Sequence, residues 1–281
     1  MPYVALIIYL AVAIALHFLL GQFPVHFFAF PLNLILAVIW ICSVIMLWRR
    51  CRKSGFVRFM LSKGSVVCSI ALFLLFSLLV GIAGRRDLVD TWIFAAIILY
   101  FQTVLLFVIL RGYRVGTEWG IGSIRWRFIL NHAGLLIALS SAFWGAPDSE
   151  TMRLRAIKGQ PVKEAIRMDG TATWMNYDVE LKDFRMEEYE NGVPSMFEAD
   201  LLVDGKSVTL RVNEPYSPSL GEDIYLTGYD VLSGTDSDYC ILQVVREPWK
   251  YAAVAGIIMM LVGALLLFIS GPRKRNGLDE I

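Results

Sequence analysis

The sequence predicts an α-helical integral membrane protein with six transmembrane helices and a small all-β extracytoplasmic domain between helices five and six. The 281 residues are 57% hydrophobic and only 18% charged, which is too apolar for an ordinary soluble domain. Six apolar runs each approach or reach the roughly 20 residues that cross a bilayer. Between the fifth and sixth runs lies a polar stretch with strand-like alternation, which predicts a sandwich or a partly open barrel.

The apolar runs and the polar stretch divide the chain into three parts. We predict a five-helix membrane bundle over 1–144, a β-rich domain over 145–249, and a final helix with a basic tail over 250–281. The first run lacks a basic leader and a small-residue cleavage site, so we interpret it as a retained helix and not as a signal peptide. The predicted spans are residues 3–20, 28–48, 66–83, 92–110, 125–144 and 251–270.

The distribution of charge predicts the orientation of the spans. Basic residues gather in the loops 49–63 and 111–127 and in the tail at 271–275, whereas residues 145–249 carry 20 acidic and 10 basic side chains. Because cytoplasmic loops are enriched in Lys and Arg, we predict cytoplasmic termini and an extracytoplasmic β domain. Arg85 and Arg86 are an exception, because they fall in a short turn on the extracytoplasmic side. The larger number of basic residues in the two loops and the tail outweighs them. The basic loops thus report topology and predict no nucleic-acid partner.

The polar domain contains six segments rich in β-branched and aromatic residues. Asp-Gly pairs at 169–170 and 204–205 and an Asn-Gly pair at 191–192 separate them, and the second Asp-Gly pair predicts a two-residue hairpin. The Pro-containing segments VNEP and YSPSLG predict an edge or loop region. The predicted strands are 152–157, 172–184, 196–203, 206–213, 222–231 and 239–245.

The cysteines and the missing motifs exclude several kinds of chemistry. Cys240 is the single cysteine of the polar domain, so this domain has no internal disulfide, and the absence of CxxC removes support for a thiol-redox or zinc-ribbon site. The domain contains no histidine, and the chain contains no Gly-rich phosphate loop and no GxSxG. We interpret the acidic cluster at 187–190 as a solvated turn or strand edge, and we assign no catalytic residue.

His132 is the candidate functional residue of the fifth span. It lies seven residues after Arg125, or roughly 10 Å along a helix. A polar side chain is costly in lipid, and neutral imidazole is an axial ligand for haem iron, so haem ligation is one hypothesis. The small residues Ala133, Gly134 and Ala138 would let a flat macrocycle, or another helix, approach closely. The alternative is that His132 forms a hydrogen bond with a neighbouring helix.

Two further histidines belong to the membrane part. His26 lies in the connection between the first two spans, among several phenylalanines, and is a candidate external haem ligand. A wet histidine in an interfacial aromatic belt is the alternative that this setting favours. His17 lies late in the first span, where it faces lipid or the helix bundle.

Three segments of the sequence resemble the ResB-like proteins of cytochrome c biogenesis. They are DFRMEEYENGVPSMFEADLLVDGK (183–206), LRVNEPYSPSLGEDIYLTGYD (210–230) and VVREPWKYAAVAGIIMMLVGALLLF (244–268). The order and spacing are similar over roughly residues 128 to 270. The positions that carry the resemblance are Phe184, Glu187, Tyr189, Gly192, Val212, Asn213, Pro215, Gly221, Tyr225, Tyr229, Arg246 and Pro248.

This resemblance implies a subunit of a haem lyase complex in a bacterial cytoplasmic membrane. It implies that His132 ligates haem b in transit, and that a CcsA/ResC-type partner supplies a second membrane histidine and a tryptophan-rich segment. Apocytochrome c would receive the haem, and a thioredoxin-like thiol reductant is a further implied partner. The chain departs from the family in having six spans where familiar members have four. A structural anchor that binds no haem is the rival hypothesis, and a small-solute transporter is a third.

Overall fold

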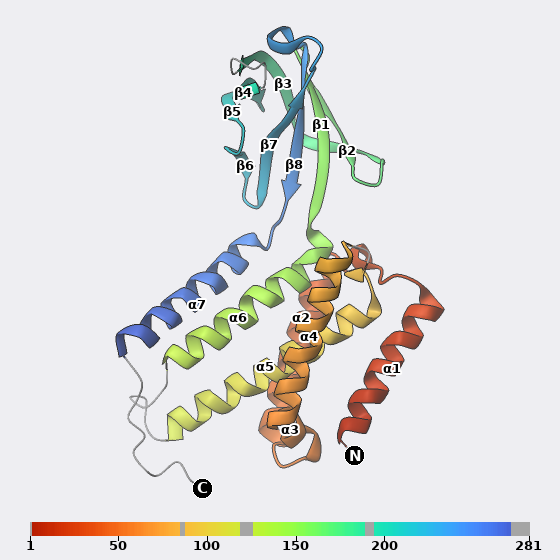
Figure 1. The fold of residues 1–281 in the computed structure, drawn as a ribbon, viewed down its shortest axis with the longest axis vertical. Coiled ribbons are helices and arrows are strands. Elements are labelled where there is room, and N and C mark those ends of the chain that lie inside the picture. The colour runs from red at the N-terminus through yellow and green to blue at the C-terminus, as the bar shows by residue number, and fades with distance from the viewer. Residues whose placement is uncertain (1, 85–87, 119–125, 189–193, 271–281) are drawn as a thin grey trace. The chain divides into compact units, whose positions relative to one another are not determined.

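The chain forms two compact units in the computed structural model (Figure 1), which describes all residues except 1, 85–87, 119–125, 189–193 and 271–281. Residues 1–147 and 249–281 make up a helical unit, and residues 148–248 make up a β unit. Several predictions lie outside the described residues, namely those on Arg85, Arg86, Arg125, the Asn-Gly pair and the basic tail.

The helical unit contains six helices that are long and apolar enough to cross a membrane, among the residues described. Their number equals the predicted number of spans, and their length and composition fit a multi-pass membrane protein. Five of these helices precede the β unit and one follows it, as predicted. Their bounds are α1 Pro2–Leu20, α2 Leu32–Arg50, α4 Lys63–Ala83, α5 Trp92–Glu118, α6 Trp126–Gly145 and α7 Lys250–Ser270.

Two connections in the helical unit differ from the prediction. The second span begins at Leu32 and not at Phe28, because the residue before Pro31 is disfavoured in a helical backbone; a short 3-10 turn, η1 (Val25–Phe28), takes its place. The basic loop contains an extra helix, α3 (Gly55–Met60), whose first turn is capped by Ser54, 3.3 Å from the Val57 amide. Six residues are too few for a helical period to stand out in the sequence.

α5 provides most of the buried core of the helical unit and contacts α1, α2, α4 and α6. Tyr100, Val104 and Phe107 are buried on it. Polar contacts join it to its neighbours: the Tyr100 hydroxyl lies 2.7 Å from Ser65 Oγ, and Gln102 Nε2 donates to the Leu139 carbonyl. Because lipid provides no hydrophobic drive between helices, such packing and hydrogen bonds hold the bundle together.

Two helix connections meet at one end of the helical unit. The Phe23 amide donates to the Asp90 carbonyl over 2.9 Å, and His26 lies against the carbonyl of Pro147 at the end of α6. The α1–α2 and α4–α5 connections therefore share one end with the end of α6, as six alternating spans require. We call this end, marked by Phe23, Asp90 and Pro147, the Asp90 end.

The β unit is one antiparallel sheet of eight strands in the order β5-β4-β3-β2-β1-β8-β7-β6. The sheet is curled, so that strands far apart in this order meet: β5 contacts β7, and Lys206 Nζ lies 5.3 Å from the Tyr216 ring. Of the two predicted alternatives, a sandwich and a partly open barrel, this single curled sheet corresponds to the partly open barrel. The strands are β1 Glu150–Ile157, β2 Val162–Arg167, β3 Ala172–Glu188, β4 Pro194–Val203, β5 Lys206–Arg211, β6 Tyr216–Ser219, β7 Glu222–Tyr229 and β8 Tyr239–Arg246.

Alternating residues of the strands fill the core of the β unit. Leu154 on β1 faces its partner Leu242 on β8, and both are almost completely buried. The predicted hairpin between β4 and β5 is confirmed, with φ of 48° at Asp204 and 77° at Gly205, as a tight two-residue turn requires. Pro218 lies in β6, which is an edge strand and therefore tolerates a residue without an amide hydrogen.

All four cysteines are free, and Cys240 is completely buried in β8. Burial raises the pKa of the Cys240 thiol to about 12, because the core disfavours the thiolate. The thiolate is the form that reacts with alkylating reagents. Cys240 is therefore protected in the folded β unit and becomes a reporter of its opening.

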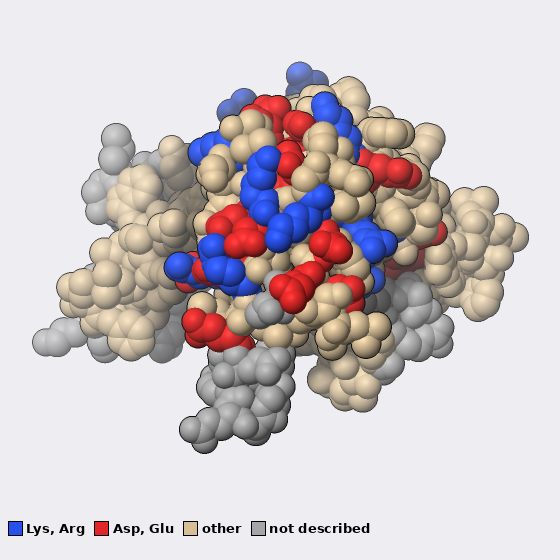
Figure 2. All heavy atoms as spheres, turned by 90° about the horizontal axis from the view of Figure 1, so that it is seen from above, with Lys and Arg blue, Asp and Glu red and all other residues tan. Residues whose placement is uncertain are grey.

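The charges of the β unit are paired across strands. On the face in Figure 2, basic and acidic side chains are interspersed. Glu198 on β4 accepts from Arg185 on β3 at 2.7 Å and from Arg211 on β5 at 3.0 Å. These hydrogen bonds, that from Arg211 first, lower the pKa of Glu198. Part of the acidic charge of the β unit is thus compensated by ion pairs between neighbouring strands.

Candidate functional site

One face of α6 packs against α7 with the two backbones in contact. A Cβ atom on Gly134 would lie 2.6 Å from the carbonyl oxygen of Gly256, and one on Gly256 would lie 2.7 Å from the Ala138 nitrogen. Real Cβ atoms do not approach backbone that closely, so glycine is needed on both helices. The space beside Gly134 is therefore taken by another helix, which was one of the two predicted uses of the small residues.

His132 lies on a different face of α6, and this face packs against α5. Phe128, one turn earlier, packs closely against Gly112 of α5. Leu136, one turn later, packs against the cluster that contains Val104 and Phe107. Residues four apart share a helix face, so His132 lies between these two contacts along the α5–α6 seam, where it is half-buried.

The hydrogen bond of His132 fixes which ring nitrogen is free to bind a ligand. Nδ1 lies 2.9 Å from the carbonyl oxygen of Phe128, and the two rings are 4.0 Å apart. A carbonyl only accepts, so Nδ1 carries the hydrogen and Nε2 of the neutral ring keeps its lone pair. Backbone carbonyls orient metal-binding histidines in this way, since the bond fixes both the tautomer and the ring. The hydrogen bond stays within α6 and does not reach a neighbouring helix.

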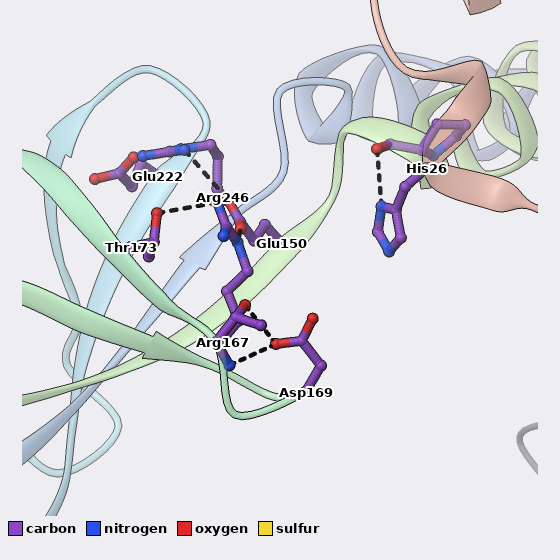
Figure 3. A network of polar contacts seen from close by, with 9 residues as sticks. His26, Glu150, Arg167, Asp169, Thr173, Glu222 and Arg246 are labelled. Carbon is purple, nitrogen blue, oxygen red and sulfur yellow. Dashed lines mark hydrogen bonds and ion pairs between the residues drawn. The ribbon is translucent and has the colours of Figure 1, made fainter.

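The other two membrane histidines lie elsewhere. His26 is exposed on η1, and its Nδ1 is 3.4 Å from the Pro147 carbonyl (Figure 3). His132 is 13 residues before the end of α6 at Gly145, which is about 20 Å along the helix axis. His132 and His26 are therefore too far apart to ligate one iron. His17 Nδ1 is buried near the end of α1 without a hydrogen-bond partner.

No group of three His, Cys, Asp or Glu side chains that could hold a metal ion occurs among the described residues. A protein-only metal centre thus has no support in that part of the chain. An imidazole alone can still serve as one axial ligand of haem, since the macrocycle supplies the other nitrogens. This is the chemistry that the His132 arrangement allows.

The structure also contains an apolar cavity of about 650 Å³ at the Asp90 end of the helical unit. α1, α2, α4, α5 and α6 all contribute to its wall, together with the connections around Phe23 and Asp90. Leu139 of α6 lines it and lies seven residues after His132, on the same face. The sequence analysis missed this cavity, because its wall comes from segments up to 138 residues apart (Tyr9 to Pro147).

A polar network joins the strands that enter and leave the β unit (Figure 3). Glu222 on β7 is buried, and it accepts from Arg246 Nε on β8 at 2.8 Å and from the Tyr177 hydroxyl. Burial, followed by the bond to Glu222, raises the pKa of Tyr177. Arg246 Nη1 also lies 3.4 Å from Glu150 on β1, and Glu150 in turn pairs with Arg167. The network links the neighbouring strands β1, β8 and β7, and the Tyr177 hydroxyl connects β3 to β7.

Four of the positions that carry the family resemblance, Phe184, Gly221, Tyr229 and Arg246, have clear structural roles. The rings of Phe184 and Tyr229 are stacked 5.0 Å apart in the core. Gly221 has a φ of 80°, and a Cβ there would lie 2.9 Å from the Cα of Pro248. Arg246 belongs to the network above. Tyr189 and Gly192 lie outside the described residues.

Comparison with known proteins agrees with the resemblance. The sequence model of the ResB-like family matches residues 122–238. No curated protein matches. Among solved structures, cytochrome c heme lyase CcmF is similar at 16% identity and a TM-score of 0.41, over 71% of this chain, which spans 33% of that one. The family match covers the segment that comprises α6 and most of the β unit, and over this segment the chain is similar to ResB-like proteins.

Proposed function

We propose that this chain is a subunit of the cytochrome c maturation machinery and that it binds haem b in transit through Nε2 of His132. The observation that carries the proposal is the hydrogen bond from Nδ1 to the Phe128 carbonyl, which leaves Nε2 as the ligating nitrogen. The ResB-like match supports the pathway. The haem is the cargo of the complex, and its final acceptor is an apocytochrome c.

The position of His132 is compatible with a site shared with a partner. The ring is half-buried at the α5–α6 seam, so the isolated chain does not enclose it. A CcsA/ResC-type haem-handling protein would supply the second axial ligand from one of its own helices. His26 is a second proposed ligand, which would serve a separate external haem because of its distance from His132. A thioredoxin-like reductant would keep the apocytochrome cysteines reduced.

A structural anchor without bound haem is the second candidate function. It is favoured by the roles of Phe184, Gly221, Tyr229 and Arg246, which all maintain the β unit. In this function the β unit docks the partner and the helices only assemble the complex. The two functions differ in whether Nε2 of His132 is needed.

Substitution of His132 separates these two functions. In His132→Asn, the amide Nδ2 takes the place of Nδ1 and keeps the donor to the Phe128 carbonyl, but no atom replaces Nε2. We expect His132→Asn and His132→Ala both to abolish the Soret band of the chain purified with its partner and to stop cytochrome c maturation. The measurement is the haem absorbance per protein together with the yield of holocytochrome in cells.

Two results would contradict haem ligation by His132. One is normal haem content in His132→Ala, and the other is full activity in His132→Asn with loss only in His132→Ala, since that pattern belongs to a structural hydrogen bond. His17→Ala serves as the control for removal of a membrane histidine. A colourless wild-type complex from haem-replete cells would favour the anchor.

We further propose the orientation in a bacterial cytoplasmic membrane, with both termini in the cytoplasm and the β unit outside. Leu232 is almost fully exposed on the β unit, and Lys53 is exposed in the basic connection before α3. In intact cells, with the native Cys42, Cys51 and Cys68 replaced by serine, a membrane-impermeant maleimide should label Leu232→Cys and should label Lys53→Cys only after lysis. Labelling with the opposite pattern would invert the topology.

A further inference from the structure

Both connections between the β unit and its flanking helices leave from the same end of the sheet. β1 begins at Glu150, five residues after α6 ends at Gly145, and β8 ends at Arg246, four residues before α7 begins at Lys250. β1 and β8 are neighbours in the sheet, and Glu150 is opposite Arg246 in their register. We call this end of the sheet, marked by Glu150 and Arg246, the helix-proximal end.

The lengths of the helices and connections keep this end within reach of lipid. α6 has 20 residues and α7 has 21, so each is about 30 Å long, which matches the hydrocarbon core of a bilayer. A helix of this length crosses the membrane without extending beyond it as a stalk. Fully extended, the connections 146–149 and 247–249 reach at most about 18 Å, and the first is shortened by the 3-10 turn η4 (Ala146–Asp148).

The turn between β6 and β7 exposes an apolar side chain at the helix-proximal end. Ser219 on β6 pairs with Glu222 on β7, so Leu220 and Gly221 form the turn. The Gly221 carbonyl accepts from the Glu247 amide at 2.6 Å, which holds the turn against the chain that leads to α7. Leu220 is 82% exposed. A large apolar side chain thus lies in water beside the connection to the last span.

The hairpin of β2 and β3 exposes a larger apolar surface at the same end. Arg167 at the end of β2 joins the polar network there through Glu150, as Figure 3 shows. Met168 is exposed in the turn, and Ile166 and Trp174 are exposed on the two strands, Trp174 by 73%. Because Ile166 is opposite residue 172, it lies diagonally across from Trp174 on one face of the hairpin. Tryptophan beside aliphatic side chains is typical of membrane–water interfaces.

A charged residue limits the depth to which this hairpin can enter a membrane. Asp169 lies in the β2–β3 turn, and its carboxylate accepts from the Thr171 amide at 2.9 Å and from the Thr171 hydroxyl at 2.7 Å. These hydrogen bonds stabilise the charged form of the carboxyl group. A charged side chain is costly in the hydrocarbon core. The turn is therefore suited to the headgroup layer and not to the core.

We propose that the helix-proximal end of the β unit docks on the surface of the membrane that α6 and α7 cross, with Met168, Trp174 and Leu220 in the headgroup layer. The two hairpins lie on opposite sides of the paired strands β1 and β8, so they support the β unit on both sides of its covalent connections. Exposed apolar patches mark sites that leave water on binding, and lipid is the apolar phase within reach of these short connections. The proposal is independent of haem binding.

The experiment uses the full chain in phosphatidylcholine nanodiscs, with the three cysteines of the helical unit replaced by serine. Cys240 stays, because burial protects it from reagents. One new cysteine, in Met168→Cys or Leu220→Cys, carries the fluorophore NBD, whose emission shifts to shorter wavelength when it leaves water. Leu232→Cys is the matched control, because Leu232 is 99% exposed between β7 and β8, at the opposite end of the sheet.

Two quenchers locate each label. A phosphatidylcholine with a nitroxide on its headgroup quenches a label in the lipid surface, and iodide quenches a label in water. We expect the labels at 168 and 220 to be quenched by the nitroxide lipid and to lose iodide quenching, and the label at 232 to show the reverse. Iodide quenching at 168 and 220 equal to that at 232 would overturn the proposal. Protection of both labels from both quenchers would also overturn it, since that pattern indicates contact with protein.

Charged side chains in the two turns provide a second test. The double variant Met168→Asp with Leu220→Asp places two carboxylates where the proposal has apolar contacts with lipid. We expect it to reduce the shift of a label at Ile166→Cys, whereas Val231→Asp with Leu232→Asp, at the opposite end, should leave that shift unchanged. An unchanged alkylation rate of the buried cysteine of β8 shows that both variants are folded. Retention of the full shift in the first double variant would contradict docking on lipid.

Discussion

Replacement of Gly134 by isoleucine is expected to separate α6 from α7 and to remove most of the thermal stability of the helical unit. The smallest added atom, Cβ, already lies 2.6 Å from the Gly256 carbonyl oxygen and 2.9 Å from the Met260 nitrogen. Both are backbone atoms of α7, which cannot rotate away as a side chain does. Overpacking of this kind costs about 1–3 kcal/mol and more when backbone must move.

A graded series distinguishes a backbone clash from a general effect of size. Gly134→Ala should lower the melting temperature in detergent, and Gly134→Val and Gly134→Ile should lower it progressively further. Gly81→Ile is the matched control, because a Cβ on Gly81 of α4 meets nothing within 4 Å. Equal melting temperatures for Gly134→Ile and Gly81→Ile would show that α6 and α7 are not in backbone contact.

The membrane helices are the part of this fold that the sequence predicts best. A span is defined by length and hydropathy alone, and neither depends on what the helix packs against. Their ends are less certain because they depend on local geometry. α2 begins later than predicted, because Pro31 disfavours a helical backbone at the residue before it. The six residues of α3 are too few to show a helical period.

The strands show where sequence patterns stop being informative. β2 and β6 were missed, since the first reads VKEAIR with three charged residues among six and the second is four residues long with a proline. Both segments form strands because they pair with neighbours. β2 pairs with β1 and with β3, and β6 pairs with β7. Cross-strand contacts, and not intrinsic preference, decide such segments.

The candidate site likewise has one part that the sequence predicts and other parts that depend on packing. His132 was identifiable, because an ionisable group within an apolar run is rare. Its hydrogen bond to Phe128 could not be predicted, since it depends on the rotamer that the α5–α6 seam selects. The cavity with Trp92 and Trp144 depends on the packing of five helices. The structural partner of Arg246 is equally hidden, because Glu222 is 24 residues away on the neighbouring strand.

Replacement of Arg246 by methionine is expected to destabilise the β unit on the order of 3 kcal/mol, because it leaves the Glu222 carboxylate buried without its cation. The side chain of Glu222 is only 6% exposed, whereas that of Arg246 is 34% exposed. Loss of the guanidinium therefore removes a charge that water cannot replace. The Glu150 carboxylate keeps Arg167 as a partner, so the effect centres on Glu222.

The burial of Cys240 provides the measurement. Alkylation of this thiol requires the β unit to open, so its rate under native conditions follows the population of the open state. A loss on the order of 3 kcal/mol should raise that rate roughly a hundredfold, since 1.4 kcal/mol is a factor of ten. Peptide mapping separates the Cys240 adduct from those of the three membrane cysteines. Arg153→Met, at an exposed position of β1, is the matched control and should leave the rate unchanged.

A second substitution tests whether the unpaired charge is the cause. In Arg246→Met with Glu222→Gln, the side chain at 222 is neutral and its carbonyl oxygen still accepts the hydrogen bond from Tyr177. We expect the double variant to recover much of the lost stability and to be less reactive at Cys240 than Arg246→Met alone. If the double variant is as reactive as the single one, the destabilisation comes from lost packing of the Arg246 stem and not from the buried carboxylate.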